Sequence, residues 1–492
     1  VVFVGRFGLL DDDGERLLVD WRAPAAEPFF AATHAHPAGI SSRRRYRWQG
    51  GAIVDYWDEV FAADGVDHSA ALDDQSAFIA SLGTSRTSRM RDVLATIQAD
   101  QDAIVRADSR GALVVDGGPG TGKTVVALHR AAYLLYADPR LGPGRGGVLV
   151  VGPHRPYLAY VEDVLPSLGE ESVRTCTLAD LVPEGMSAGP ERDPRVAALK
   201  GTAEMVAAIE PAVALFEEPP THELTVSTPW GDAILTSGDW ADAFAAAEPG
   251  ATHNEARDQV WEEVLDILVS QHDEDAPPHQ VRRALARDPE LARTFTRAWP
   301  LLDAAQVVAD LWSVPAYLRR SAPHLARTDV DLLQRGDPRA WTMADLPLLD
   351  AARARIGDPE ESKRRRRREA ERERERERRA AVIDDLIASD DSEMLVMSML
   401  RRPDAQNSLD DDAPPESPDP DALAGPFAHI VVDEAQELTQ AQWRMLLRRC
   451  PSRSLTIVGD RAQARHGFGE SWEDRLAAAG LRDIRVGTLS VN

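Results

Sequence analysis

Four short apolar runs, rich in β-branched residues, lie far apart along the chain. They cover residues 112–115, 148–151, 429–432 and 454–458. Runs of this length that are apolar at successive positions predict strands buried on both faces, which is typical of a parallel sheet. Residues 125–135 are apolar nearly all round, so a buried helix is predicted after the first strand. The pattern therefore predicts an α/β fold.

A different pattern opens the chain. Residues 1–4 and 17–19 have the composition of strands, and an Asp-Asp-Asp-Gly turn signal lies between them at 11–14. Arginines interleave with a tyrosine and a tryptophan over residues 43–48. That pattern fits a basic surface on which nucleic-acid bases stack or, as we favour, an exposed strand whose arginine stems cover aromatic rings. We predict a small β-rich segment over residues 1–65, packed on the α/β domain.

The α/β domain is predicted to have two parts, residues 66–174 and 426–492, because these contain the apolar runs. Between them, over residues 175–400, strand signals become sparse and amphipathic helices dominate. A Thr-His-Asn-Glu capping box at 252–255 begins one of these helices, and residues 229–232 suggest a small hairpin. Residues 175–400 are thus predicted to be a mainly helical insertion, and insertions of this size usually bind partners.

Two segments have unusual charge. Glu and Arg alternate over residues 363–379, so opposite charges fall at i,i+3 and like charges at i,i+4, with effects that partly cancel. We interpret this run as a solvated helix or linker. Residues 403–424 contain seven acidic residues, five prolines and no basic residue, and such a composition cannot bury enough apolar surface to order itself. The acidic segment, 401–425, is either a passive linker or a ligand for a basic partner.

Composition narrows the functional class. The formal net charge is −25, which argues against a protein that grips nucleic acid along its length and favours a basic protein partner. Cys176 and Cys450 lie far apart, so neither a disulfide framework nor a zinc site is indicated, and a reducing cytoplasm fits best. The sequence shows no signal peptide and no apolar run of membrane-spanning length. We expect a cytoplasmic monomer without membrane contact.

The strongest chemical signal follows the first apolar run. Residues 117–124 have the G-x-x-x-x-G-K-[ST] spacing of a phosphate-binding loop between a strand and a helix. Glycines let backbone N–H groups point at phosphate oxygens, the helix N-terminus adds positive charge, the lysine reaches the β- and γ-phosphates, and the threonine hydroxyl binds Mg²⁺. An accidental glycine-rich turn is the alternative. The predicted ATP-binding residues of the loop are Gly117, Gly118, Pro119, Gly120, Thr121, Gly122, Lys123 and Thr124.

Polar side chains follow the third and fourth apolar runs. Asp433 is placed to hold Mg²⁺, directly or through water, and Glu434 to orient and deprotonate the attacking water. Gln463, after the fourth run, is placed to sense the γ-phosphate. An isolated Asp-Glu pair would be a solvated strand end, but three matching strand ends in the correct order favour a catalytic site. Its predicted catalytic residues are Lys123, Glu434 and Gln463.

These residues carry a family resemblance. The matching stretches are GRFGLLDDDGERLLVDWRAPAAEPFF, IQADQD, GGPGTGKT, VLVVGPHRPYLAYVEDVLPSLGE and HIVVDEAQELTQAQWRMLLRRCPSRSLTIVGDRAQ. They resemble superfamily 1 helicase-like ATPases of the UvrD/Rep type, and most of all the HelD group of bacterial motor ATPases that bind and recycle RNA polymerase. The resemblance covers roughly residues 1–170 and 425–492. It implies a P-loop, RecA-like parallel sheet interrupted by the helical insertion.

The resemblance assigns further roles. It implies ATP and Mg²⁺ as cofactors, and it makes Gln101 the glutamine that reads adenine, with Gln98 as the second candidate. A glutamine amide suits this role because its donor and acceptor match adenine N6 and N7. His154 stands where the family pattern has asparagine.

The resemblance also implies a partner, bacterial RNA polymerase, with DNA or RNA reached only through it. The insertion would contact the polymerase clamp, and the acidic segment would enter the main channel. The acidic residues of that channel loop are Asp404, Asp410, Asp411, Asp412, Glu416, Asp419 and Asp421.

Two family elements are absent from this sequence, an N-terminal coiled coil and the second RecA-like domain with the arginines that complete the active site. Arginine fingers raise the rate of nucleotide hydrolysis by a factor of roughly 10³–10⁵. We therefore expect a fragment that binds ATP weakly and scarcely hydrolyses it.

Three functions are compatible with these observations. The leading prediction is an ATP-dependent motor protein that dissociates RNA polymerase from nucleic acid. The second is a DNA helicase or translocase of repair, and the third is a non-catalytic polymerase-binding module. Net acidity and the acidic, proline-rich segment favour the first over the second.

Overall fold

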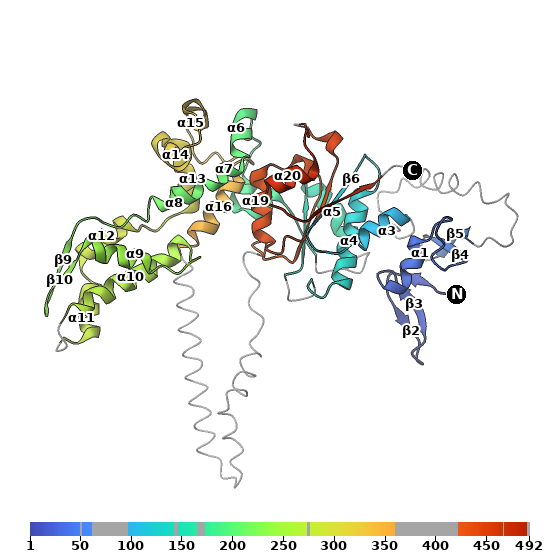
Figure 1. Cartoon of the computed structure of the whole chain (residues 1–492), viewed down its shortest axis with the longest axis horizontal. Helices are drawn as coiled ribbons and strands as arrows, with labels where there is room; N and C mark the ends of the chain where they lie inside the picture. Colours follow the sequence, from blue (N-terminus) through green and yellow to red (C-terminus); the bar gives the residue numbers. More distant parts are fainter. Residues whose placement is uncertain are drawn as a thin grey trace, which may run out of the picture. The chain divides into compact units, whose positions relative to one another are not determined.

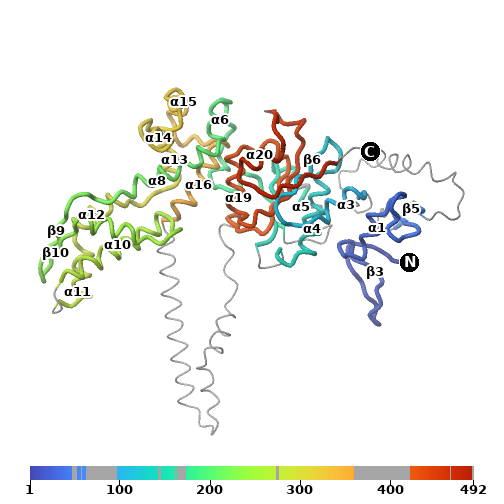
Figure 2. Tube along the Cα trace, in the orientation of Figure 1, coloured from blue at the N-terminus to red at the C-terminus, as the bar shows by residue number. Residues whose placement is uncertain are grey.

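The structure is a computed structural model that describes residues 1–49, 52–61, 97–141, 146–164, 173–272, 276–359, 422–465 and 467–489. It contains two compact units, one formed by Val1–Met186 with Ala424–Asn492 and the other by Ser187–Leu423. The first unit is thus built from both ends of the sequence. Within it, the cyan and red parts of the trace lie side by side in Figure 2, because strands from these two parts pair with each other.

Six parallel strands form the core of the first unit (Figure 1). Their order is β13-β6-β12-β11-β7-β8, and each neighbouring pair is parallel. The predicted α/β class with a parallel sheet is confirmed, and all four predicted strands are present. The strands are β6 (Ala112–Gly117), β7 (Val148–Gly152), β8 (Arg174–Thr177), β11 (His429–Val432), β12 (Leu455–Gly459) and β13 (Ile484–Leu489).

Helices cover both faces of this sheet. Right-handed connections between parallel strands place α4 and α5, which follow β6 and β7, on one face and α19 and α20 on the other (Figure 1). β7 and β11 are buried along their whole length, which explains why their sequences are apolar apart from His429. The helices of this unit are α1 (Glu27–Ala31), α3 (Ala99–Val105), α4 (Lys123–Ala137), α5 (Arg155–Val164), α19 (Gln440–Arg449) and α20 (Trp472–Ala478).

The sheet extends further along the chain than the sequence pattern indicates. The predicted insertion begins at residue 175, but that position lies inside β8, which pairs with β7. The first unit continues to Met186 and resumes at Ala424. β8 is only four residues long and contains an arginine and two threonines, so it carries no apolar signal.

The opening segment consists of short strands and one helix. β1 (Val4–Gly5) pairs parallel with β3 (Arg16–Asp20), and β2 (Leu9–Leu10) pairs antiparallel with β3. The predicted turn at 11–14 is confirmed, with Gly14 at φ 82°, whereas the predicted strand over residues 1–4 is limited to its last residue. Trp21 is buried and packs edge-on against His129 of α4, with ring centroids 5.5 Å apart. This contact attaches the segment to the α/β domain.

The arginine-rich strand is occupied by contacts within the protein. β4 (Ser42–Gln49) pairs antiparallel with β5 (Ala52–Val60). Arg43 is buried against Glu59 and lies over the Phe61 ring, 5.3 Å from its centroid. Arg44 pairs with Asp58 at 2.6 Å and lies over the Tyr56 ring. Of the two alternatives for this strand, the described side chains therefore fit arginines that cover aromatic rings.

Arg130 of α4 is fully buried and joins three elements. Its guanidinium donates to the carbonyl oxygens of Ile104 and Asp108, at and just beyond the C-terminal end of α3, at 3.0 and 2.7 Å. Its Nε donates to Thr456 Oγ1 of β12 at 3.0 Å. Arginine has five donors in a fixed plane, so one side chain satisfies carbonyl groups that the helix end leaves free. The bonds hold α3 against α4 and the sheet.

His429 continues this buried network. Arg130 can only donate, so Thr456 Oγ1 accepts from it and donates to His429 Nε2, 2.9 Å away. Ser454 Oγ donates to the carbonyl of Ser109, so His429 Nδ1 must donate to Ser454, 2.7 Å away. The network is complete only when His429 is neutral with its proton on Nδ1. Burial, and after it the charge of Arg130, lowers the pKa of His429 to about 3.

We predict that the first unit loses stability as the pH falls below 6.5. The folded-state pKa of His429, about 3, and that of His129, lowered by burial to about 4, lie below the unfolded value. The unfolded chain therefore binds protons that the folded chain excludes, and stability present above pH 6.5 is lost as the pH falls. At pH 5 each histidine should lower the free energy of unfolding by about 2 kcal/mol.

Urea denaturation at pH 7.5 and pH 5.0 measures this loss. His429→Gln should lose about 2 kcal/mol less than the parent between the two pH values, because the glutamine does not titrate. His36→Gln, at an exposed histidine, is the matched control and should lose as much as the parent. The same loss in His429→Gln as in the parent would show that His429 does not carry the effect.

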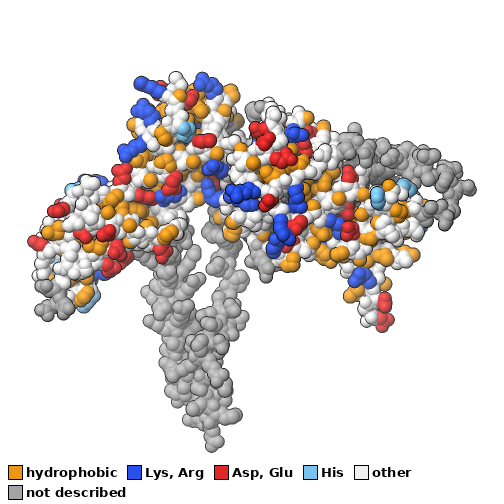
Figure 3. Space-filling view, in the orientation of Figure 1, with side chains coloured by type: hydrophobic (Ala, Val, Ile, Leu, Met, Phe, Trp, Pro, Cys, Tyr) orange, Lys and Arg blue, Asp and Glu red, His pale blue; other side chains and the backbone are white. Residues whose placement is uncertain are grey.

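Over residues 187–272, 276–359 and 422–423, the second unit is mainly helical, and β9 (Leu224–Thr228) and β10 (Gly231–Leu235) form a hairpin. The hairpin predicted at 229–232 and the capping box predicted at 252–255 are both present. Acidic side chains lie at several points on the face of this unit that Figure 3 shows. Its helices are α6 (Pro194–Lys200), α7 (Ala203–Ala207), α8 (Ile209–Ala214), α9 (Ser237–Ala245), α10 (His253–Ser270), α11 (Pro278–Leu285), α12 (Pro289–Ala298), α13 (Ala304–Ser313), α14 (Pro315–Ser321), α15 (Arg327–Leu333) and α16 (Leu346–Ile356).

A buried ion pair joins α6 to the start of α16. Lys200, at the end of α6, is 2% exposed and its Nζ lies 2.8 Å from Asp345 Oδ1, directly before α16. Arg335 donates to the other oxygen of Asp345 at 2.9 Å. Because buried charges require partners, these contacts hold α6 and α16 together.

Candidate nucleotide site

The predicted site residues converge at one edge of the six-stranded sheet. β6, β12 and β11 are neighbours and parallel, so their carboxyl ends lie at the same edge. The glycine-rich loop, residues 117–122, continues from β6 into α4, while Asp433 and Asp460 directly follow β11 and β12. The Asp433 N–H donates to the carbonyl of Val151 in β7 at 3.0 Å, which holds the residue at the strand end.

The backbone of the loop requires its glycines. Gly120 and Gly122 have φ values of 78° and 81°, in the left-handed region that side chains disfavour. A Cβ on Gly117 would lie 2.8 Å from the carbonyl oxygen of Leu489 in β13. The loop therefore passes close to the neighbouring strand and turns directly into α4. No side chain caps the start of α4.

Lys123 folds back over this loop. Its Nζ donates to the carbonyl oxygens of Gly117 at 2.6 Å and Gly118 at 2.9 Å. Thr121 Oγ1 also donates to the Gly118 carbonyl, at 2.9 Å. The ammonium group thus lies inside the curve of the loop, where it can act as a compact positive charge.

A short hydrogen bond joins the two distant parts of the sequence. Thr124 Oγ1 donates to Asp433 Oδ2 at 2.6 Å, and Asp433 is buried. The backbone N–H of Glu434 donates to the other oxygen, Oδ1, at 2.8 Å. The structure therefore brings together the hydroxyl and the carboxylate that were assigned to Mg²⁺ from the sequence.

Glu434 is exposed and linked to the next strand. It adopts φ 54°, a left-handed conformation that is uncommon outside glycine. Gln436 Nε2 donates to Glu434 Oε2 at 2.6 Å, while Gln436 Oε1 accepts from the N–H of Asp460 at 3.1 Å. The buried amide of Gln436, which our sequence analysis did not identify, thus connects Glu434 to the end of β12.

Gln463 is placed near this edge but apart from the other residues. It ends the short 3₁₀ turn Arg461–Gln463 after β12 and is exposed. In the part of the chain that the structure describes, its side chain has no hydrogen bond to the other predicted site residues. Its neighbour Arg461 instead pairs with Asp116 of β6, with Nε 3.1 Å from Oδ2.

The two candidate glutamines of α3 take different places. Gln101 Nε2 donates to the carbonyl of Thr121 at 3.2 Å, so this amide lies against the glycine-rich loop. Gln98 is the N-cap of α3, in a capping box with Gln101. The geometry therefore favours Gln101 over Gln98 as the residue beside a bound base.

His154 also has a local role. Its Nδ1 accepts from the N–H of Tyr157, 3.1 Å away, at the start of α5. Asparagine, which the family pattern has here, makes the same kind of bond at a helix N-terminus. The substitution is therefore compatible with the local structure.

Tyr157 of α5 is a site residue that our sequence analysis did not identify. Its hydroxyl donates to Asp433 Oδ2 at 2.6 Å. The available signal was chemical, since a partly buried tyrosine usually finds a partner for its hydroxyl. The identity of that partner depends on the pairing of β7 with β11, which the local sequence does not contain.

The donor set suits magnesium better than a transition metal. The described residues contain no group of three or more His, Cys, Asp or Glu side chains that could hold a metal ion. Magnesium usually uses one or two protein oxygens and takes its other ligands from water and substrate phosphates. Thr124 and Asp433 fit that requirement.

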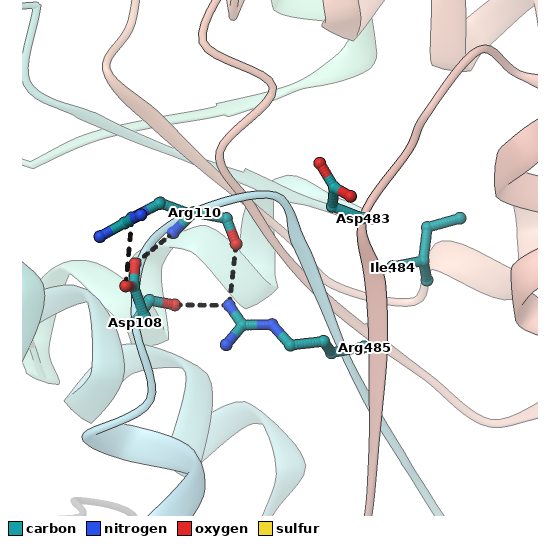
Figure 4. Close-up of a pocket in the computed structure, with 5 residues that line it drawn as sticks. All are labelled: Asp108, Arg110, Asp483, Ile484 and Arg485. Atoms are coloured by element: carbon teal, nitrogen blue, oxygen red, sulfur yellow. Dashed lines mark hydrogen bonds and ion pairs between the residues drawn. The ribbon is translucent and has the colours of Figure 1, made fainter.

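A cavity of about 490 Å³ lies at the opposite edge of the sheet, before β6 and at the start of β13 (Figure 4). Arg110 and Arg485 both line it. Arg110 pairs with Asp108, with Nε 3.3 Å from Oδ2, and Arg485 Nη2 donates to the carbonyl oxygens of Asp108 and Arg110, each at 2.8 Å. Arg485 therefore serves the local backbone, and the cavity is separate from the candidate site.

The acidic channel loop cannot be placed, because residues 360–421 lie outside the described residues. This range also includes the Glu/Arg run. In the part of the first unit that the structure describes, Cys176 and Cys450 are free and buried. No helix among the described residues is long and apolar enough to cross a membrane.

Comparison with known proteins places the opening segment in a helicase-related class. Residues 1–75 match the model of a family described as DNA helicase IV HelD, N-terminal domain. This match supports assignment of the chain to the HelD family, so the resemblance seen in the sequence is confirmed. No curated protein matches the chain.

Proposed function

We propose that this chain is the nucleotide-binding part of an ATP-dependent motor of the HelD type that binds RNA polymerase and dissociates it from nucleic acid. The Thr124–Asp433 hydrogen bond is the observation that carries the ATP site. It joins a glycine-rich loop to a strand-end carboxylate at a sequence separation of 309. This combination is the one expected of a P-loop, RecA-like domain, and it supports that domain over an accidental glycine-rich turn.

The residues of the chain divide the proposed chemistry among them. The loop N–H groups and Lys123 would hold the phosphates, and Gln101 would contact the base. Bound magnesium, held by Thr124 and Asp433, would neutralise phosphate charge. Glu434 is exposed and would orient and deprotonate water, while Gln436 sets the direction of its carboxylate. Gln463 would reach the γ-phosphate only after movement of the turn that carries it.

The proposed partner rests on charge and on the family resemblance. A net charge of −25 favours a basic protein surface over naked nucleic acid. A polymerase channel is basic because it holds a polyanion, and the acidic segment 401–425 would enter it as an electrostatic substitute. The cytoplasm, where polymerase acts, keeps the two cysteines reduced.

The matched family is named for a DNA helicase, and this observation favours a second candidate, a helicase or translocase that acts on DNA directly. The polymerase-dissociating motor needs polymerase for its activity, whereas a DNA helicase or translocase acts on DNA without polymerase. A third possibility, a polymerase-binding module without ATP chemistry, predicts no nucleotide binding.

Binding of a fluorescent ATP analogue with Mg²⁺ tests the nucleotide site. Lys123→Ala should weaken binding at least tenfold, because a charge-assisted contact to phosphate is lost, and Lys123→Arg should not restore it, since a planar fork does not fit the curve of the loop. Lys363→Ala, at a lysine of the Glu/Arg run, is the matched control. If Lys123→Ala bound the fluorescent ATP analogue as tightly as the parent, the proposed nucleotide site would be wrong.

Hydrolysis tests the role of Glu434 separately. In the chain joined to a second RecA-like domain, Glu434→Gln should keep nucleotide affinity within about threefold and lower the hydrolysis rate by about 10²–10⁴, because the amide cannot accept a proton. The rate is measured as released phosphate, and the protein without the substitution is measured under the same conditions. Hydrolysis at the parent rate would show that another group activates water.

Release of nucleic acid from a stalled polymerase complex tests the partner. The chain joined to a second RecA-like domain should release it, and Asp410→Asn, Asp411→Asn and Asp412→Asn together in that protein should reduce release at matched polymerase occupancy, because the densest charge of the loop is lost. Asp11→Asn, Asp12→Asn and Asp13→Asn together are the matched control, with the same change in charge. Unwinding of a forked DNA duplex without polymerase would favour the helicase instead.

A further inference from the structure

Asp433 has three donors in this structure, and one of them is unexpected for a magnesium site. Thr124 Oγ1 and the Tyr157 hydroxyl both donate to Oδ2, each at 2.6 Å. The Glu434 N–H donates to Oδ1 at 2.8 Å. The carboxylate oxygen that faces the loop hydroxyl is therefore shared by two hydroxyl groups.

The ring of Tyr157 is held in this position by its surroundings. A Cβ on Gly152, at the end of β7, would lie 2.5 Å from the ring, so the glycine makes room for it. His154 packs edge-on with centroids 6.3 Å apart, and the ring packs against the core beneath α4. The hydroxyl thus reaches Asp433 from a fixed ring.

The Tyr157 hydroxyl donates its proton to Asp433 Oδ2. This hydrogen bond uses part of the negative charge of Oδ2, which is then less available to another donor or to a cation.

The two hydroxyls differ in what they can do when magnesium binds. Thr124 can offer a lone pair to the ion while it still donates its proton to Asp433. Tyr157 donates to the same oxygen, Oδ2, as Thr124. If Asp433 held magnesium through a water ligand, that water would need an acceptor position on this carboxylate, and the Tyr157 hydroxyl would compete with it.

We propose that Tyr157 is a positioning residue that holds Asp433 in the metal-free state and raises the magnesium concentration needed for nucleotide binding. This inference rests on the proposed nucleotide site and deepens it. In the metal-free protein, Tyr157 gives the buried carboxylate a third donor, beside Thr124 and the Glu434 N–H. When magnesium binds, this hydrogen bond is lost or lengthened, which opposes binding.

The experiment is a Mg²⁺ titration of binding at a fixed, saturating concentration of the fluorescent ATP analogue. Tyr157→Phe keeps the ring and its packing and removes only the hydroxyl. The magnesium concentration at half-maximal binding should fall about tenfold, the scale expected for a hydrogen bond to a charged group. Nucleotide affinity measured in EDTA should stay within about twofold, because the competition needs the ion.

Tyr136→Phe, on α4 of the same unit, is the matched control and should leave the magnesium midpoint unchanged. An unchanged or higher midpoint in Tyr157→Phe, with parent-like binding in EDTA, would overturn this inference and leave the nucleotide site intact. An equal change with and without magnesium would assign Tyr157 a purely structural role and would overturn it too. No binding of the analogue by the parent would overturn the nucleotide site itself, and this inference with it.

Discussion

β11 lies between β7 and β12, and the sheet depends on that position. On one side β11 pairs with β7, where His429 lies opposite Val148, and on the other side it pairs with β12, where Ile430 lies opposite Leu455. Both faces of β11 are buried and a strand lies on each side of it, so its backbone groups hydrogen-bond with β7 and β12. The chain must therefore return from the second unit before the sheet is complete. The same pairing sets Asp433 beside Thr124, so the candidate site exists only when the two parts of the sequence have joined.

Polar groups serve different purposes at the two edges of this sheet. At the amino edge, Arg130, Thr456 and His429 form a buried network that satisfies backbone carbonyls and holds α3 in place. Breaking such a network leaves buried groups without partners, which is costly. At the carboxyl edge, Glu434 is exposed and Lys123 contacts only carbonyl oxygens. These groups have partners that phosphate or water can replace.

Much of this arrangement could be predicted from the sequence because its central strands consist mainly of apolar, β-branched residues. β6, β7, β11 and β12 gave clear signals, and the glycine spacing predicted the loop. β13 gave none, since it is an edge strand with exposed polar positions, and β8 is short and polar. The contacts of Tyr157 and Gln436 could not be predicted, because each partner comes from a different strand end. The left-handed backbone of Glu434 likewise follows from its tertiary setting.

The central claim is that residues from both parts of the sequence form one magnesium–nucleotide site. A double-mutant cycle with Thr124→Val and Asp433→Asn, measured as affinity for the fluorescent ATP analogue in Mg²⁺, tests it directly. If the two side chains act as a unit, the double variant should bind only slightly more weakly than either single variant, with a coupling energy of about 1 kcal/mol or more. Effects that add within about 0.5 kcal/mol would show independent side chains and would contradict the claim.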